Sequence, residues 1–255
     1  MNHLTKPGRI LFAIAIASFG IHYLVFAAKI SAAPPGPPWF PGAHWLSWAA
    51  GAGLLIAGLS LLINLKGRWA ALLLGLALLL HAAFVHLPAL LANVHDPRPW
   101  TNIGEILSIC GGALVLAGAL GKGPDGPRLP ASFSNGTILV GQYLFALPLF
   151  IFGAQHLIYG KFVATLIPSW IPGHLFWAYF IGAVFIATGL AIVSRQLAGL
   201  AATLLGLMFF LWVFILHSPL VAASPHRGNG WTSLFVALAM CGASWTVAGT
   251  LAQRE

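Results

Sequence analysis

The sequence predicts an all-α integral membrane protein with eight transmembrane helices, arranged as two parallel four-helix repeats. The first observation behind this prediction is composition: hydrophobic residues make up 59% of the 255 residues and charged residues only 6%. A soluble domain carries about a quarter charged residues, so the composition excludes a soluble globular protein. The apolar stretches lack the alternation of porin strands, and a spanning helix satisfies its own backbone hydrogen bonds. Helices are therefore predicted.

The second observation is a series of apolar segments long enough to cross a hydrocarbon core of about 30 Å, which takes about 20 helical residues. The first segment follows Lys6 and Arg9, but it lacks the cleavage pattern of a signal peptide, so we interpret it as a retained span. The eight predicted spans cover residues 10–28, 45–64, 70–91, 102–120, 137–159, 175–194, 198–220 and 232–251.

The third observation is an internal repeat. Between Trp39, which matches Trp170, and Gly118, which matches Gly249, many residues recur 131 positions later without a gap. A repeat of this length indicates a duplicated structural unit. Because each unit has an even number of helices, both insert with the same orientation, and we expect a pseudo-two-fold axis along the membrane normal.

The distribution of basic residues predicts the orientation. Eight Lys and Arg residues lie on the side of the termini and four on the other side, which places both termini in the cytoplasm. The first repeat then covers residues 1–121, a cytoplasmic linker 122–135, and the second repeat 136–255. The net charge of +8 reflects this topology and contact with membrane lipid, and no basic run with interleaved aromatic residues indicates a nucleic-acid partner.

Two matched segments on the outer side carry the histidines of greatest interest. His86 is followed by His95, and His217 by His226, nine residues later in each case. Imidazole binds metal or haem iron and relays protons near neutral pH, so the four histidines are candidate ligands of a metal or a headgroup. The alternative is structural, because a histidine near a helix end can also cap carbonyl groups. We leave both interpretations open.

Four tryptophans complete these outer segments. Trp100 and Trp231 each precede a predicted helix, and Trp39 and Trp170 lie in matched loops rich in proline and glycine. Such rings either wall a site for a lipid-soluble substrate or anchor the chain at the membrane interface.

Glu105 is the one carboxylate inside a predicted span, and its counterpart in the second repeat is Val236. An ionisable residue within the membrane is a functional candidate by default. It could pair with a histidine or with Arg98, or form a hydrogen bond between helices as a neutral acid. His22 and His156, in the first helix of each repeat, are either buried hydrogen-bond partners or the deeper wall of the same cavity.

The second half resembles the DoxX-like family of small bacterial four-helix membrane proteins. The resemblance runs from Phe152 to Ala248 and includes FGAQHLIYGKFVATLIPSWIPGHLFWAYF and LAATLLGLMFFLWVFILHSP. The first half resembles a more diverged copy, so the chain looks like a tandem duplication of the family's unit. The resemblance implies a location in the bacterial inner membrane and a quinone-linked redox role at the outer face.

The function expected from these observations is that of a quinone-linked redox subunit or small membrane oxidoreductase, with its site on the outer face between the repeats. We expect catalytic roles for Glu105, His86 and His217. The expected binding residues are His95, His226, Trp39, Trp170, Trp100 and Trp231. One alternative is a haem- or copper-binding protein with His86, His217, His95 and His226 as ligands; another is a non-catalytic scaffold or assembly subunit of a larger membrane complex.

Overall fold

The computed structural model describes residues 2–30, 44–120, 130–226 and 228–251, and within these ranges the chain forms helices and turns without a strand. In chain order the elements are the 3-10 turn η1 (Asn2–Leu4), α1 (Thr5–Ile30), α2 (His44–Ile63), α3 (Gly67–His81), the π-helical turn η2 (Ala82–His86), α4 (Leu87–Ala92), α5 (Pro97–Leu120), α6 (Ala131–Ile158), α7 (Gly160–Ala164), α8 (His174–Ser194), α9 (Ala198–Trp212), the π-helical turn η3 (Val213–His217), α10 (Ser218–Ala223) and α11 (Gly228–Leu251).

Eight helices in the described ranges are long and apolar enough to cross a membrane, which confirms the eight predicted spans. Most differences lie at the ends. The span of α5 begins at Pro97 and that of α6 at Ala131, several residues before the predicted starts at 102 and 137. A hydropathy pattern misses the polar first turns of such helices, whereas proline is well suited to the first position of α5 because its φ is already helical.

The third and seventh spans each contain a π-helical turn. Both spans continue beyond His86 and His217, as the predicted spans 70–91 and 198–220 do, because α4 and α10 follow η2 and η3. Pro88 and Pro219 lie in the first turns of these continuing segments, where a missing backbone N–H is tolerated best. In each π-turn the backbone hydrogen bonds are shifted ahead of the proline, which has no N–H to donate.

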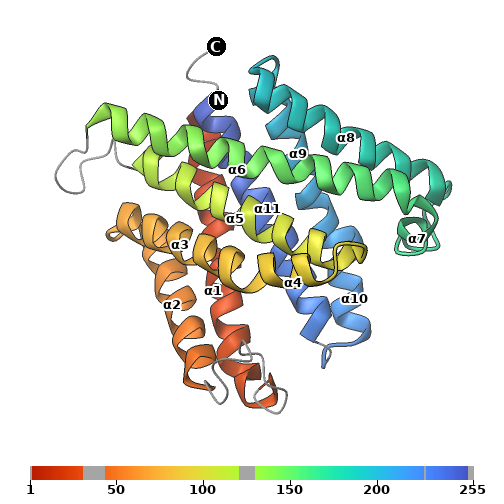
Figure 1. Ribbon diagram of the computed structural model, residues 1–255, viewed down its shortest axis with the longest axis horizontal. Helices are drawn as coiled ribbons and strands as arrows, with labels where there is room; N and C mark the ends of the chain where they lie inside the picture. The colour runs from red at the N-terminus through yellow and green to blue at the C-terminus, as the bar shows by residue number, and fades with distance from the viewer. Residues whose placement is uncertain (1, 31–43, 121–129, 227, 252–255) are drawn as a thin grey trace.

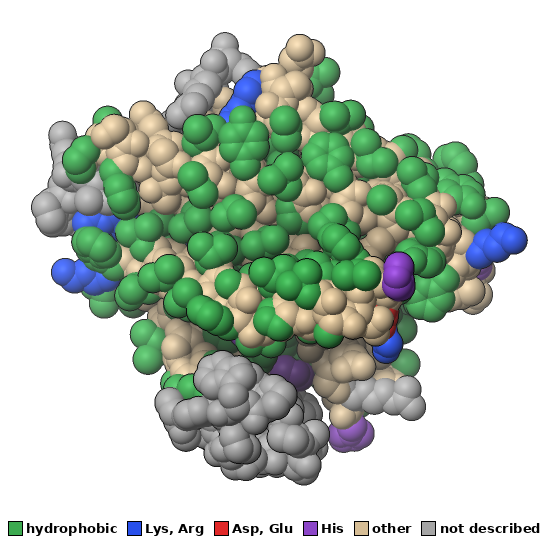
Figure 2. Space-filling model, in the orientation of Figure 1, with side chains coloured by type: hydrophobic (Ala, Val, Ile, Leu, Met, Phe, Trp, Pro, Cys, Tyr) green, Lys and Arg blue, Asp and Glu red, His purple; other side chains and the backbone are tan. Residues whose placement is uncertain are grey.

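The centre of the bundle is formed by α5 and α11, which contact each other. Of their spans 67% and 78% are buried, compared with 17–50% for the other six. Many large hydrophobic side chains are exposed, and the face seen in Figure 2 is largely apolar, with Lys and Arg mostly near its edges. An apolar surface suits a helix bundle whose outer residues face lipid tails.

Each half of the chain packs its first helix against the last helix of the other half. Helix α1 contacts α2 and α11, and α6 contacts α8 and α5. In Figure 1, α1 and α2 run toward the bottom of the view while α6 and α8 extend to the right. The crossing of α5 and α6 is close: a Cβ on Gly111 would lie 2.5 Å from the carbonyl oxygen of Gly141. The two halves are therefore interleaved, and sites form from both.

Candidate functional site

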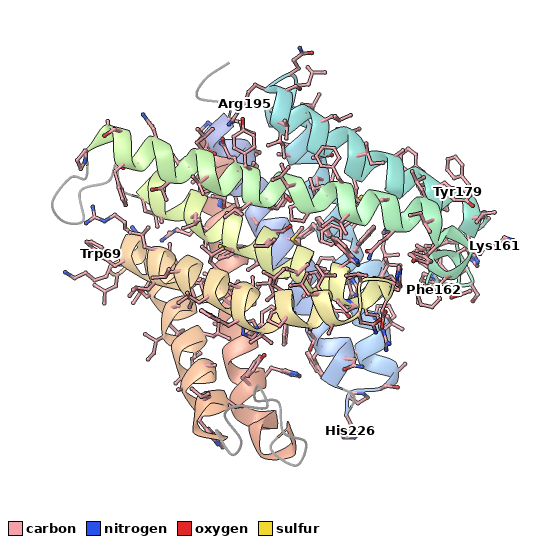
Figure 3. All side chains as sticks on the ribbon, viewed as in Figure 1. Trp69, Lys161, Phe162, Tyr179, Arg195 and His226 are labelled. Atoms are coloured by element: carbon pink, nitrogen blue, oxygen red, sulfur yellow. The ribbon has the colours of Figure 1, made fainter. Side chains whose placement is uncertain are left out.

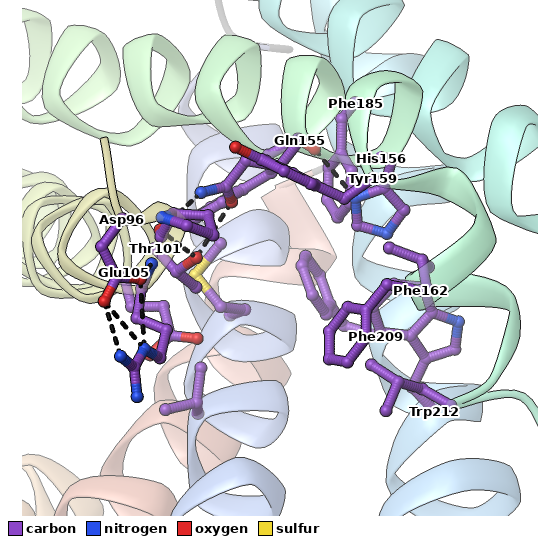
Figure 4. Close-up of a pocket in the computed structure, with 17 residues that line it drawn as sticks. Asp96, Thr101, Glu105, Gln155, His156, Tyr159, Phe162, Phe185, Phe209 and Trp212 are labelled. Carbon is purple, nitrogen blue, oxygen red and sulfur yellow. Dashed lines mark hydrogen bonds and ion pairs between the residues drawn. The ribbon is translucent and has the colours of Figure 1, made fainter. Parts of the chain in front are cut away.

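A cavity of about 520 Å³ lies where the start of α5 meets the end of α6, and α7, α8, α9 and α11 complete its walls (Figure 4). Most of its lining is apolar or aromatic, and the polar groups come from α5, the end of α6 and the residue before α5. The lining residues are Asp96, Pro97, Arg98, Thr101, Glu105, Phe152, Gln155, His156, Tyr159, Phe162, Val163, Leu166, Phe185, Phe209, Trp212, Val236 and Met240.

Two hydrogen bonds of Gln155, one with Thr101 and one with Pro97, connect the start of α5 to the end of α6. The Thr101 hydroxyl donates to Gln155 Oε1 at 2.9 Å, and Gln155 Nε2 donates to the Pro97 carbonyl oxygen at 2.7 Å. These bonds satisfy the side-chain polar groups of both residues in a half-buried position. The Gln155 amide is thereby held as part of the wall.

Glu105 lies one turn further along α5 and lines the cavity. Within the described ranges its carboxyl group has no hydrogen-bond or ion-pair partner, so it pairs neither with a histidine nor with Arg98. The preceding residue, Gly104, packs closely against the Phe152 ring, because a Cβ there would lie 2.9 Å from Cε1 of Phe152. The carboxyl group is thus the polar group that remains available inside the apolar part of the cavity.

Arg98 is engaged at the rim. Its guanidinium contacts the Asp96 carboxylate at 2.6 Å, and the Arg98 side chain is 84% exposed. The hydrogen bond from Arg98 lowers the pKa of the Asp96 carboxyl group below its ordinary value, because it stabilises the charged form. The rim therefore carries a fixed ion pair with almost no net charge.

His156 stands on the opposite wall, on α6. Its Nδ1 atom lies 2.8 Å from the carbonyl oxygen of Phe152, and its ring meets Phe185 edge to face at 5.3 Å between centroids. Helix α8 approaches closely here, since a Cβ on Gly182 would lie 2.9 Å from the His156 Cβ. The ring is held between these contacts and points into the cavity (Figure 4).

Aromatic rings from α8 and α9 form the deep wall. The ring centroid of Phe209 lies 5.9 Å from that of Phe185 and 5.3 Å from that of Trp212. The ring centroids of Phe185 and Trp212 are 6.1 Å apart. Offset and edge contacts of this kind are favourable between rings. The wall presents flat apolar surfaces to anything bound in the cavity.

The four histidines expected to form the site lie outside the lining of this cavity. His86 and His217 end the two π-turns, and the His86 ring contacts that of His81 at 4.9 Å. His95 and His226 lie in exposed turns, and Figure 3 shows His226 at the lower tip of the molecule. In the part of the chain that the structure describes, no three His, Cys, Asp or Glu residues form a group that could hold a metal ion.

Trp100, Trp170 and Trp231 lie outside the lining of this cavity. The indole N–H of Trp100 donates to the Val94 carbonyl and that of Trp231 to the Pro225 carbonyl, both at 2.9 Å. Each ring closes the loop before its helix. Trp170 is 69% exposed and does not line the cavity, and Trp39 lies outside the described residues.

Of the site residues expected from the sequence, Glu105 lines the cavity, and His156 was expected there only as one of two alternatives. The sequence reasoning missed Thr101, Gln155 and the aromatic wall of α8 and α9. The sequence does contain a signal for Gln155 and His156, because they are adjacent polar residues within a long apolar segment. Comparison with known proteins adds no further candidate, since no family model, curated protein or solved structure matches the chain.

Proposed function

We propose that this protein binds a lipid-soluble ring compound of the quinone class in the cavity and acts as a quinone-linked redox subunit or small oxidoreductase. The proposal depends above all on Glu105, an unpaired carboxyl group on the wall of an aromatic cavity inside the membrane-spanning bundle. Unpaired ionisable groups are costly in the membrane and are found there mainly at functional sites.

The chemistry of the cavity suits such a ligand. A carboxylate without a partner is unfavourable in apolar surroundings, so the neutral acid is the expected form, and its O–H can donate to a ring carbonyl. Phe209 and Trp212 offer faces on which a ring can stack. Ligand cavities of about 300–1,000 Å³ hold drug-sized molecules, so about 520 Å³ accommodates a quinone ring and the first part of its tail.

The proposed route of entry is from the outer leaflet, past α7. Phe162 and Leu166 line the cavity and are also 65% and 60% exposed on the apolar outside of the bundle. A long isoprenoid tail can therefore remain in lipid while the ring occupies the cavity. This route requires no charged group to enter the membrane.

The proposed architecture is a tandem duplication of a DoxX-like unit in the bacterial inner membrane, with both termini in the cytoplasm and a pseudo-two-fold axis along the membrane normal. Matched element bounds support it: η2 (Ala82–His86) and η3 (Val213–His217) are offset by 131 residues, as are α5 and α11. The exchanged packing of α1 on α11 and of α6 on α5 supports it as well. The orientation rests on the basic residues.

Binding to the purified protein in lipid nanodiscs tests the proposal. A benzoquinone with a ten-carbon tail and its quinol are titrated, with tryptophan fluorescence as the readout. We expect one molecule of either form bound per chain, and we expect Glu105→Leu to weaken binding about 10-fold, since a buried hydrogen bond contributes about 1–1.5 kcal/mol. His86→Leu, which lies outside the cavity, serves as the matched control and should bind as the wild type does.

Absence of binding of both forms to the wild type would contradict the proposal. A Soret band in the absorption spectrum or copper in elemental analysis would instead favour the haem or copper alternative. Copurification of a stoichiometric protein partner, without any cofactor in this chain, would favour the scaffold alternative.

A further inference from the structure

The hydrogen bond between His156 and its own helix determines which nitrogen of the imidazole carries a proton. Nδ1 lies 2.8 Å from the carbonyl oxygen of Phe152, and a carbonyl oxygen can only accept. Nδ1 is therefore the donor, and in a neutral imidazole the other nitrogen, Nε2, then presents a lone pair. The geometry makes Nε2 a hydrogen-bond acceptor.

This acceptor has no partner among the residues that the structure describes. Nδ1 forms the one hydrogen bond of the His156 side chain in the described ranges. The ring is kept from turning by the edge contact with Phe185 and by the close approach of α8 at Gly182. Nε2 is thus fixed on the wall of the cavity with its lone pair unused.

The other polar side chains of the cavity are mostly occupied. Thr101 and Gln155 bind each other, and Asp96 binds Arg98. Among the described residues that line the cavity, the side-chain groups left without a partner are the Glu105 carboxyl group, His156 Nε2, the Tyr159 hydroxyl and the Trp212 indole N–H. A neutral carboxyl group and a phenol can each donate or accept, whereas Nε2 in this tautomer can only accept.

We propose that His156 Nε2 accepts a hydrogen bond from a ring hydroxyl, so that the cavity selects the reduced, hydroxyl-bearing form of its ligand. A quinol supplies this donor. An oxidised quinone has only acceptors and would place a carbonyl lone pair against that of Nε2. The inference rests on the proposed function and assigns His156 as a specificity-determining residue within it.

A comparison of matched ligands tests the inference. The probes are a benzoquinol with a ten-carbon tail, kept reduced under anaerobic conditions, and its dimethyl ether, which has the same ring but no hydroxyl donor. We expect the wild type in nanodiscs to bind the quinol about 10-fold more tightly than the ether, because the ether leaves Nε2 unpaired. In His156→Phe the difference should fall below about 2-fold, whereas the control His86→Phe should keep it.

The outcomes separate the two proposals. If the wild type binds quinol, quinone and ether equally, the role of His156 is overturned while the quinone-class cavity stands. If none of the three binds, the proposed function itself fails. Should His156→Phe not fold, ¹⁵N spectra of histidine-labelled wild type decide the matter: Nε2 of His156, assigned with His156→Gln, should be unprotonated and should shift with the quinol but not with the ether. A protonated Nε2 would overturn the inference.

Discussion

Gly104 and Phe235 occupy matched positions on α5 and α11, 131 residues apart, and they produce opposite environments. Gly104 lets the Phe152 ring approach α5 closely, since a Cβ there would lie 2.9 Å from Phe152 Cε1, and Phe152 lines the cavity. At the matched position the Phe235 ring packs against two other rings. Its centroid lies 5.5 Å from that of Phe19 and 5.8 Å from that of Trp231. The crossing of α5 and α6 therefore borders a cavity, whereas the matched crossing of α11 and α1 carries an aromatic cluster.

The neighbouring positions differ in the same direction. Glu105 corresponds to Val236, and, in the register that matches Phe19 with Phe152, His156 corresponds to Tyr23. The structure supports that register: a Cβ on Gly51 would lie 3.1 Å from the Tyr23 Cβ, and a Cβ on Gly182, its match, 2.9 Å from the His156 Cβ. Similar helix packing thus carries a carboxyl group and an imidazole at the α5–α6 crossing, and a valine and a tyrosine at the matched α11–α1 crossing. The difference localises the proposed chemistry to one side of the molecule.

The largest effect on stability is expected from removing the Phe235 ring, which packs against Phe19 and Trp231. Phe235→Ala should lower the free energy of unfolding by about 3–5 kcal/mol, because it removes a buried ring and leaves a cavity. Unfolding in mixed micelles, followed by circular dichroism, measures the change. Phe214→Ala serves as control, since Phe214 is 58% exposed on the outside of η3. Equal losses for the two variants would contradict the assignment of Phe235 as a packing residue.

The reverse change should displace Phe152, which lines the cavity. Gly104→Phe introduces the second half's residue into the first, and we expect a loss of about 1–3 kcal/mol in unfolding free energy because the Phe152 ring must move. Quinone and quinol binding should also disappear. Gly53→Phe is the matched control, as no atom lies within 4 Å of a Cβ built there. Ligand binding that survives Gly104→Phe would place the ligand elsewhere.

Moving the carboxyl group from position 105 to its match at position 236 tests whether its place on α5 matters for binding. Val236 lines the same cavity as Glu105, so a glutamate there would still face a bound ligand. Glu105→Val should weaken quinone binding about 10-fold, and the double variant Glu105→Val with Val236→Glu should recover part of this loss. Titration in nanodiscs gives the three dissociation constants. If the double variant binds no better than Glu105→Val, the carboxyl group acts only from α5.

The smallest difference is expected where the halves agree. Trp100→Phe and Trp231→Phe each remove one indole hydrogen bond of 2.9 Å to a loop carbonyl, so each should cost about 0.5–1.5 kcal/mol of unfolding free energy. Thermal unfolding measures both, and ligand binding should be unchanged. A selective loss of binding in either variant would return these tryptophans to the site.

The spans could be predicted because the requirement that creates them is local. A helix in lipid needs about 20 apolar residues in succession, and this run is visible in the sequence without knowledge of any neighbour. The π-turns at Ala82–His86 and Val213–His217 were not predicted. They depend on a shift of backbone hydrogen bonds before Pro88 and Pro219, and hydropathy does not record such a shift.

The candidate site was predicted only in part. Glu105 was found because a carboxyl group within a span is conspicuous wherever its partners lie. His86 and His217 were selected because both repeats retain them, but matched residues can equally serve the shared packing. The cavity instead lies where the repeats differ, at Glu105 and His156, and a search for matched pairs passes over such positions.

The sequence by itself determined that this is a helical membrane protein with eight spans, and it revealed the internal repeat and Glu105. Those features follow from the order of residues within single segments. The contact between the end of α6 and the start of α5, which brings His156 and Gln155 into one cavity with Glu105 and Thr101, is visible only in the folded molecule. That meeting depends on close helix crossings, such as the one at Gly111 and Gly141, and the partner of a glycine cannot be read from its own segment.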